Sequence, residues 1–242
     1  MGLIRLDKQY ENLYVAGCSF TTGYKQGIKG SWGTYLAKKL NCKCVMNGIN
    51  SNTNYHMMIG VINLCESTDM SNSCIGIQLT ERSRRELWLI NQSTYYTFNY
   101  ATLDLNDYNS LNNEMKFLKD NLSKIEPIYF DDRENLLRTI TAITMLKNYF
   151  ENKKIDYIFF EGISSINDDI SNIDDVNMPN ILGKKYRESL LNDPTFFSKY
   201  GPMQPFNRTH PLYDVEKNGG HPNSEFVEWW VEEMYQHIKD NQ

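Results

Sequence analysis

Short apolar runs, each closed by Gly or by polar turn residues, recur through the first 80 residues and again near the middle of the chain. Runs of this length are typical of strands that are buried on both faces of a sheet. They predict strands at 13–16, 44–46, 73–79 and 155–160. Apolar residues at helical spacing predict helices over about 31–40, 53–66, 111–125, 131–152, 184–191 and 224–239.

The order of these elements indicates the fold class. Strand, helix, strand, helix and strand follow one another in the first 80 residues, which predicts parallel βαβ units with helices on both faces of one sheet. Segment 91–109 is rich in Tyr, Thr and Asn, and we expect it to be irregular with a short extended piece at 95–98. Segment 163–217 has five Pro, and we expect a long loop excursion around the helix at 184–191. No linker is evident, so we expect a single α/β domain over 1–242, with insertions at about 91–130 and 163–217.

Composition narrows the class of protein. A net charge of −5 and a pI of about 5.5 weigh against non-specific nucleic-acid binding, which needs a basic face. Residues 1–12 are polar and do not resemble a signal peptide, and no apolar run approaches the ~20 residues of a membrane span. The five Cys lack a zinc spacing, and we expect free thiols in a reducing compartment. These observations predict a soluble cytoplasmic protein (of the host cell if viral) that binds neither membrane nor nucleic acid.

A serine at the end of the first predicted strand is the strongest chemical signal. The apolar run 13–16 leads into Gly17, Ser19 follows, and the chain stays small and polar up to Gly23. In an open α/β sheet, ligands bind at the carboxyl ends of the strands. We therefore predict that Ser19 is a nucleophile, although a serine at this place can also simply cap a helix.

A serine nucleophile needs a base, and the chain has four His. His221 stands in a Gly-Gly-His-Pro-Asn loop just ahead of the last predicted helix, where its ring can point along the sheet edge. His210 also lies in a loop and is the competing candidate. His56 lies inside a predicted helix, and His237 is among charged residues of the last helix. We expect a packed or surface role for both.

Four short motifs carry a family resemblance. Gly17-Cys18-Ser19-Phe20-Thr21, the loop 47–54, Gln78-Leu79-Thr80 and His221-Pro222-Asn223 occur in the order of the four sequence blocks of the SGNH (GDSL-like) hydrolase superfamily. The chain resembles most the divergent branch common in bacteriophages, where a Gly-Cys-Ser-Phe-Thr start is familiar. The resemblance implies a flavodoxin-like three-layer α/β/α sandwich with a mainly parallel sheet and inserted cap segments. It also implies hydrolysis of acyl or acetyl esters, on glycans or small molecules, with no metal and no other cofactor.

The resemblance also implies an oxyanion hole. Ser19 matches the nucleophile, and its own backbone N–H is one oxyanion donor. The second block supplies a backbone N–H from Gly48 or Ser51. In the third block Thr80 stands where the family has an Asn, with Gln78 two residues earlier. A Thr hydroxyl can donate, but it reaches less far, and loss of one such donor costs about 10²–10³ in rate.

The fourth block departs from the family at the acid that orients the base. Asn218 occupies the position three residues before His221. An Asn can hold an imidazole by a hydrogen bond, but it does not stabilise imidazolium as a carboxylate does. Asp214 replaces it if the loop folds back.

Two arginines near the third block add a possible anion site. Arg82 and Arg84 follow the third predicted strand, where with Gln78 they could bind substrate or form a solvated face. Two rival functions remain open on this fold: a non-catalytic binding or virion-associated protein, and an acyltransferase that uses the same serine.

Overall fold

Five parallel strands form the central sheet, in the order β2-β1-β3-β6-β7. They are β1 (Asn12–Ala16), β2 (Lys43–Met46), β3 (Ser73–Leu79), β6 (Asp156–Glu161) and β7 (Phe196–Phe197). This computed structural model describes residues 2–23, 30–48, 53–82, 84–89, 94–98, 113–121, 124, 132–166, 184–203, 210–212 and 221–242. The strand order is that of flavodoxin-like doubly wound sheets, so the predicted fold class is confirmed.

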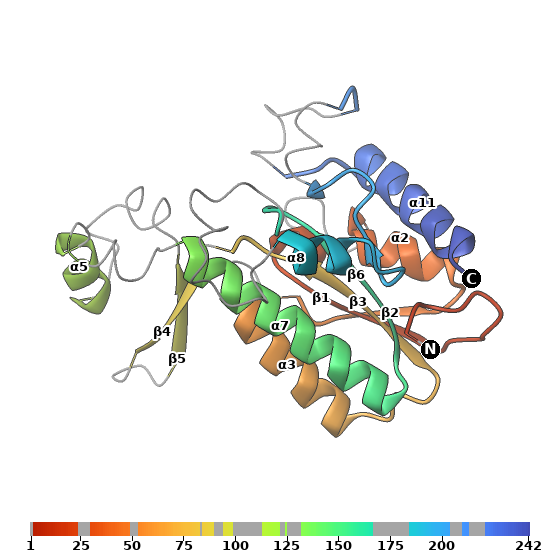
Figure 1. Cartoon of the computed structure of the whole chain (residues 1–242), viewed down its shortest axis with the longest axis horizontal. Coiled ribbons are helices and arrows are strands. Elements are labelled where there is room, and N and C mark those ends of the chain that lie inside the picture. Colours follow the sequence, from red (N-terminus) through yellow and green to blue (C-terminus); the bar gives the residue numbers. More distant parts are fainter. Residues whose placement is uncertain are drawn as a thin grey trace.

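Helices cover both faces of the sheet (Figure 1). One face packs on α3 (Asn54–Ser67) and α7 (Asp132–Lys153), and the other on α2 (Trp32–Lys39) and α11 (Ser224–Asp240). Successive side chains of a strand point to opposite faces. Accordingly β6 sends Phe159 to the α3–α7 side and Phe160 to the α2–α11 side. Within the described ranges, no helix is both long and apolar enough to cross a membrane.

Two helices, α2 and α11, begin at residues whose side chains cap the helix N-terminus. Ser31 accepts a hydrogen bond from the Thr34 N–H at the start of α2, and Asn223 accepts one from the Phe226 N–H at the start of α11. Such caps contribute about 0.5–2 kcal/mol each. The Asn223 cap fixes where α11 starts, and it therefore also constrains the position of His221, two residues earlier in the chain.

Two parts of the structure differ from the sequence prediction. Segment 163–217 contains, besides α8 (Lys184–Leu191), the edge strand β7, which pairs with β6 through Phe159↔Phe196 and Phe160↔Phe197. β4 (Arg85–Leu89) and β5 (Thr94–Phe98) pair as antiparallel strands. The expected extended piece at 95–98 is therefore confirmed, whereas the prediction of a polar loop to residue 86 was wrong because β4 begins at Arg85. Figure 1 shows these two strands and α5 (Asn113–Asp120) apart from the central sheet. Of the two predicted insertions, residues 91–93, 99–112, 122–123, 125–130, 167–183, 204–209 and 213–217 lie outside the described residues.

Candidate active site

The nucleophile candidate stands on a sharp turn at the carboxyl end of β1. Ser19 opens α1 (Ser19–Thr22), a single helical turn that follows the strand after only two residues. The N–H groups of Thr21 and Thr22 donate to the Cys18 carbonyl at 2.9 and 3.2 Å. The turn ends at Gly23, whose φ of 68° is a left-handed conformation that suits glycine. This geometry brings Ser19 to the sheet edge where α/β proteins bind ligands.

His221 lies beside this serine. Its Nε2 is 3.1 Å from the Ser19 Oγ, although the two residues are 202 positions apart in the chain. The ring of Phe20 packs edge-on against the imidazole, with centroids 5.1 Å apart. Both Ser19 and His221 are half-buried, and with Phe20, Gly23 and Pro222, among others, they line one small hollow. At this distance a neutral imidazole can accept the serine proton.

The competing histidine is elsewhere. The Nδ1 of His210 accepts a hydrogen bond from the Leu212 N–H, and its ring stacks on Trp229 of α11 at 4.5 Å. His237 lies near the other end of α11, with its Nε2 2.9 Å from the Pro194 carbonyl oxygen. Of these three histidines, His221 is therefore the one that the structure places within hydrogen-bond reach of Ser19, whereas His210 contacts Trp229.

The second block lies against residues 17–23, the turn that carries Ser19 and that we call the nucleophile turn. The Asn47 N–H donates to the Val15 carbonyl at 2.8 Å, so β2 runs parallel to β1 up to this point. Gly48 then packs on α1 so closely that a Cβ there would lie 3.0 Å from the Thr21 Cγ2. The Ser19 N–H opens the helical turn and has no intrahelical acceptor. The oxyanion roles of Ser19 and Gly48 stay predictions, and Ser51 lies outside the described residues.

Thr80, the third-block residue, is tied to α3. Its N–H donates to the Asn54 Oδ1 at 2.8 Å, and the Asn54 Nδ2 lies 3.4 Å from its carbonyl oxygen. The Thr80 hydroxyl accepts a hydrogen bond from Arg84 at 3.3 Å, and its side chain is almost fully buried. Asn54 thus clamps the end of β3, a role that sequence reasoning missed. An oxyanion role for Thr80 stays a prediction.

The remaining predicted site residues fall into two groups. Gln78 is completely buried, and its Oε1 accepts a hydrogen bond from the Thr21 hydroxyl at 2.6 Å, directly behind the nucleophile turn. Arg82 donates to the Ser165 carbonyl at 2.8 Å and so holds the chain that follows β6. Substrate binding by Gln78, Arg82 and Arg84 stays a prediction.

The two candidates for orienting His221 are Asn218 and Asp214. Both lie outside the described residues.

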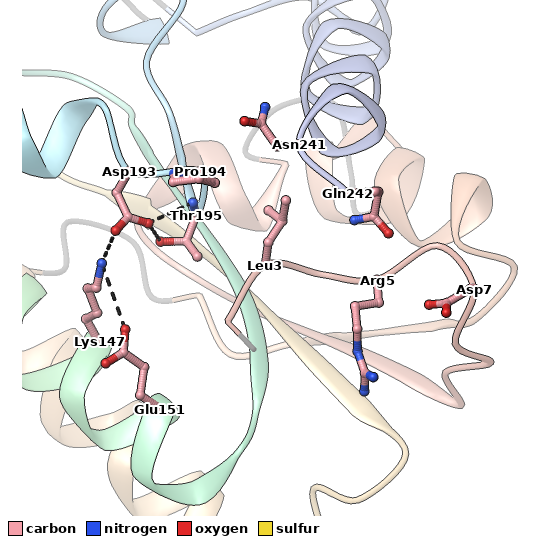
Figure 2. A pocket seen from close by; sticks show the side chains of 10 residues that line it. All are labelled: Leu3, Arg5, Asp7, Lys147, Glu151, Asp193, Pro194, Thr195, Asn241 and Gln242. Carbon is pink, nitrogen blue, oxygen red and sulfur yellow. Dashed lines mark hydrogen bonds and ion pairs between the residues drawn. The ribbon is translucent and has the colours of Figure 1, made fainter.

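A larger hollow of about 680 Å³ lies at the other end of the sheet, where the strands begin (Figure 2). Lys147 in its wall pairs with both Glu151 and Asp193, and Asp193 also accepts hydrogen bonds from Thr195. Lys147 thus offsets part of the negative charge of the two carboxylates, and none of the predicted site residues lines the hollow. Among the described residues, no group of three or more His, Cys, Asp or Glu side chains is placed to hold a metal ion.

Comparison by sequence finds neither a matching protein-family model nor a matching curated protein. Comparison by structure finds similar chains, among them the following three esterases. EstA from Pseudoalteromonas sp. has a TM-score of 0.51 and 14% identity over 95% of this chain and 97% of its own. The acetyl xylan esterase Est2A from Butyrivibrio proteoclasticus has a TM-score of 0.51 and 12% identity over 96% of this chain and 64% of its own. The acetylxylan esterase Axe2 from Geobacillus stearothermophilus, solved as a catalytic mutant, has a TM-score of 0.50 and 11% identity over 96% and 95%.

The chain has the fold of these esterases. At 11–14% identity the likeness extends to the fold and not to the activity. The side chains at the sheet edge therefore carry the inference about function.

Proposed function

We propose that the protein is a serine ester hydrolase of the SGNH type. The observation that carries this proposal is the 3.1 Å approach of the His221 Nε2 to the Ser19 Oγ at the carboxyl edge of a parallel sheet. A nucleophile and a base within hydrogen-bond reach are the signature of covalent acyl transfer. The Gly-Cys-Ser-Phe-Thr start further supports placement in the divergent branch common in bacteriophages.

In the proposed reaction, the Ser19 hydroxyl gives its proton to His221 while its Oγ bonds to the ester carbonyl carbon. The oxyanion that forms is stabilised by the backbone N–H groups of Ser19 and of Gly48 or Ser51, with the Thr80 hydroxyl as a third donor. His221 then gives the proton to the leaving alcohol, and the C–O bond breaks. Water hydrolyses the acyl-enzyme by the same steps in reverse. Asn218 or Asp214 orients the imidazole through its Nδ1–H.

The substrate we propose is an acyl or acetyl ester, including acetyl esters carried by glycans. Two of the structurally similar proteins are acetylxylan esterases, which supports an acetyl ester as the proposed substrate. Phe20, Pro222 and Val227 give the small hollow at Ser19 an apolar wall.

Hydrolysis of p-nitrophenyl acetate tests the proposal. We expect Ser19→Ala and His221→Ala each to lower kcat/KM by about 10³-fold or more, because the nucleophile and its base act as one unit. His210→Ala is the matched control, since that ring stacks on Trp229 and should leave the rate within about threefold of wild type. A fluorophosphonate should label wild type at Ser19 and should not label Ser19→Ala.

Two results would contradict the proposal. Activity that is absent from wild type, or is unchanged by Ser19→Ala, would favour a non-catalytic binding or virion-associated role on this fold. Product formation that rises with an added acceptor alcohol, beyond hydrolysis alone, would identify an acyltransferase that uses the same serine.

A further inference from the structure

A chain of buried hydrogen bonds runs directly behind the nucleophile turn. The Trp32 indole N–H donates to the Thr21 Oγ1 at 3.1 Å, and the Thr21 hydroxyl donates to the Gln78 Oε1 at 2.6 Å. The three side chains come from α2, α1 and β3, and each is 0% exposed. The chain therefore joins three separate elements at the point where Ser19 is presented.

Each bond has a defined donor. An indole N–H is only a donor, and the Thr21 hydroxyl, which accepts from Trp32, gives its own proton to the Gln78 Oε1. The Gln78 Oε1 faces Thr21 and also lies 3.8 Å from the Cys18 thiol, which donates to it. The amide orientation of Gln78 follows, with its Nε2 beside Gly162, where a Cβ would lie 2.6 Å from that nitrogen.

Packing alone does not account for a glutamine at this place. The Gln78 Nε2 is buried and finds no hydrogen-bond partner in the part of the chain that the structure describes. A buried donor without an acceptor costs free energy that a methionine of similar size would avoid. The acceptor Oε1 therefore has a use that outweighs the orphaned donor, and its partners are Thr21 and Cys18, the residues on either side of Ser19 and Phe20.

We propose that Thr21, held between Trp32 and Gln78, positions Ser19 against His221. An isolated helical turn of four residues has little stability of its own, so its place is set by tertiary contacts. Thr21 belongs to the same turn as Ser19, and its hydroxyl is anchored from both sides. Neither Thr21 nor Gln78 touches the reacting atoms, so both are positioning residues. The inference rests on the proposed esterase function for its kinetic test.

Thr21→Val removes the hydroxyl and keeps the shape of the side chain. We expect the second-order rate of fluorophosphonate labelling and the kcat for p-nitrophenyl acetate to fall about 10²-fold, the usual effect of displacing a reacting group by about 1 Å. The KM should stay within about threefold. Thr21→Ser should restore the rate to within about threefold of wild type, because it returns the hydroxyl. Gln78→Met should lower the rate similarly, and it replaces Thr21→Val as the test if that variant does not fold.

Thr195→Val is the matched control. Thr195 is also a buried threonine with a hydroxyl hydrogen bond, to Asp193 at 2.5 Å, but it lies where the strands begin. We expect it to lower stability to a degree similar to Thr21→Val while the labelling rate stays at the wild-type value. Equal rates in Thr21→Val, Thr195→Val and wild type would overturn the positioning role.

Crystal structures of Thr21→Val and Thr195→Val separate this inference from the proposed function. The Ser19 Oγ to His221 Nε2 distance should lengthen beyond 3.5 Å in Thr21→Val and remain near 3.1 Å in Thr195→Val. An unchanged distance in Thr21→Val would refute the positioning role even if the enzyme is active. A lengthened distance would support it even if the wild-type protein hydrolyses no ester.

Discussion

Replacing Gly17 by Ala tests how tightly the nucleophile turn is packed. A Cβ at this position would lie 2.2 Å from the Thr21 Oγ1, 2.9 Å from the Gln78 Cβ and 3.0 Å from the Gln78 carbonyl oxygen. Ordinary van der Waals contacts begin near 3.4 Å. The Thr21 side chain, and with it the turn that carries Ser19, must therefore move by about 1 Å. Because the contacts include backbone, rotation of one flexible side chain does not relieve them.

The displacement should affect both rate and stability. A shift of about 1 Å in a reacting group lowers the rate by about 10²-fold, so we expect kcat/KM for p-nitrophenyl acetate to fall by that factor. Overpacking of a filled interior costs about 1–3 kcal/mol in the free energy of unfolding. For a chain of this length each kcal/mol lowers Tm by roughly 2–4 °C. Urea unfolding and a thermal melt measure the second effect independently of the first.

Gly60→Ala is the control for the glycine substitution itself. Gly60 lies inside α3, and a Cβ there would meet nothing within 4 Å. We expect this variant to gain about 0.5–1 kcal/mol from improved helix propensity and to keep the wild-type rate. If Gly17→Ala retained both the activity and the stability of wild type, the close packing of β1, Thr21 and Gln78 described above would be wrong.

Two further predictions concern groups away from Ser19. Burial, and then the neighbouring Cys44, raise the pKa of the Cys42 thiol to about 11, so only about 10⁻³ of this thiol is ionised at pH 8. Because the thiolate is the reactive form, iodoacetamide should label native Cys42 about 100-fold more slowly than an unfolded thiol. Labelling of native Cys42 at the unfolded rate would contradict this expectation. Burial tends to raise the pKa of Asp193, but hydrogen bonds from Lys147 and Thr195 outweigh it and lower that pKa below its ordinary value. Its contribution to stability is therefore present above about pH 4 and is lost as the pH falls through the folded-state pKa. Urea unfolding between pH 7 and pH 3 should show a shallower acid loss in Asp193→Asn than in wild type, and parallel curves would refute the assignment.

The sequence predicts the central layers of the fold well because they follow a single strong rule. β3 has the predicted bounds, 73–79, and all seven of its residues are buried. A parallel strand covered on both faces reads as a nearly continuous apolar run, which Gln78 interrupts in β3, and such a run is easily recognised in a sequence. The inward face of α11 is equally clear, since Phe226, Trp230, Met234 and Ile238 are spaced four apart and all are 0% exposed.

The missed elements lack such a signal for physical reasons. β7 has only two residues, which is too short for any period to show, and it exists because β6 offers it an unpaired edge. β4 begins with Arg85 and Glu86, which read as a continuation of the polar loop after β3. Its partner β5 contains the extended piece expected at 95–98, but the pairing of the two strands depends on both of them together. Local pattern does not contain these tertiary choices.

The same distinction holds within the candidate site. The motifs predict Ser19 and His221 because each lies in a short turn with its own residue signature, and in the structure the His221 Nε2 lies 3.1 Å from the Ser19 Oγ. The groups behind them carry no such signature: Trp32 reads as an apolar helix residue, and Thr21 as one more small residue of the turn. Their hydrogen bonds become visible only when α1, α2 and β3 are packed together. Gly17 and Gly162 then gain a reason as well, since side chains there would collide with Thr21 and Gln78. The motifs identify Ser19 and His221 as the proposed reacting pair, and the packing adds the contacts that we propose hold the pair within hydrogen-bond reach.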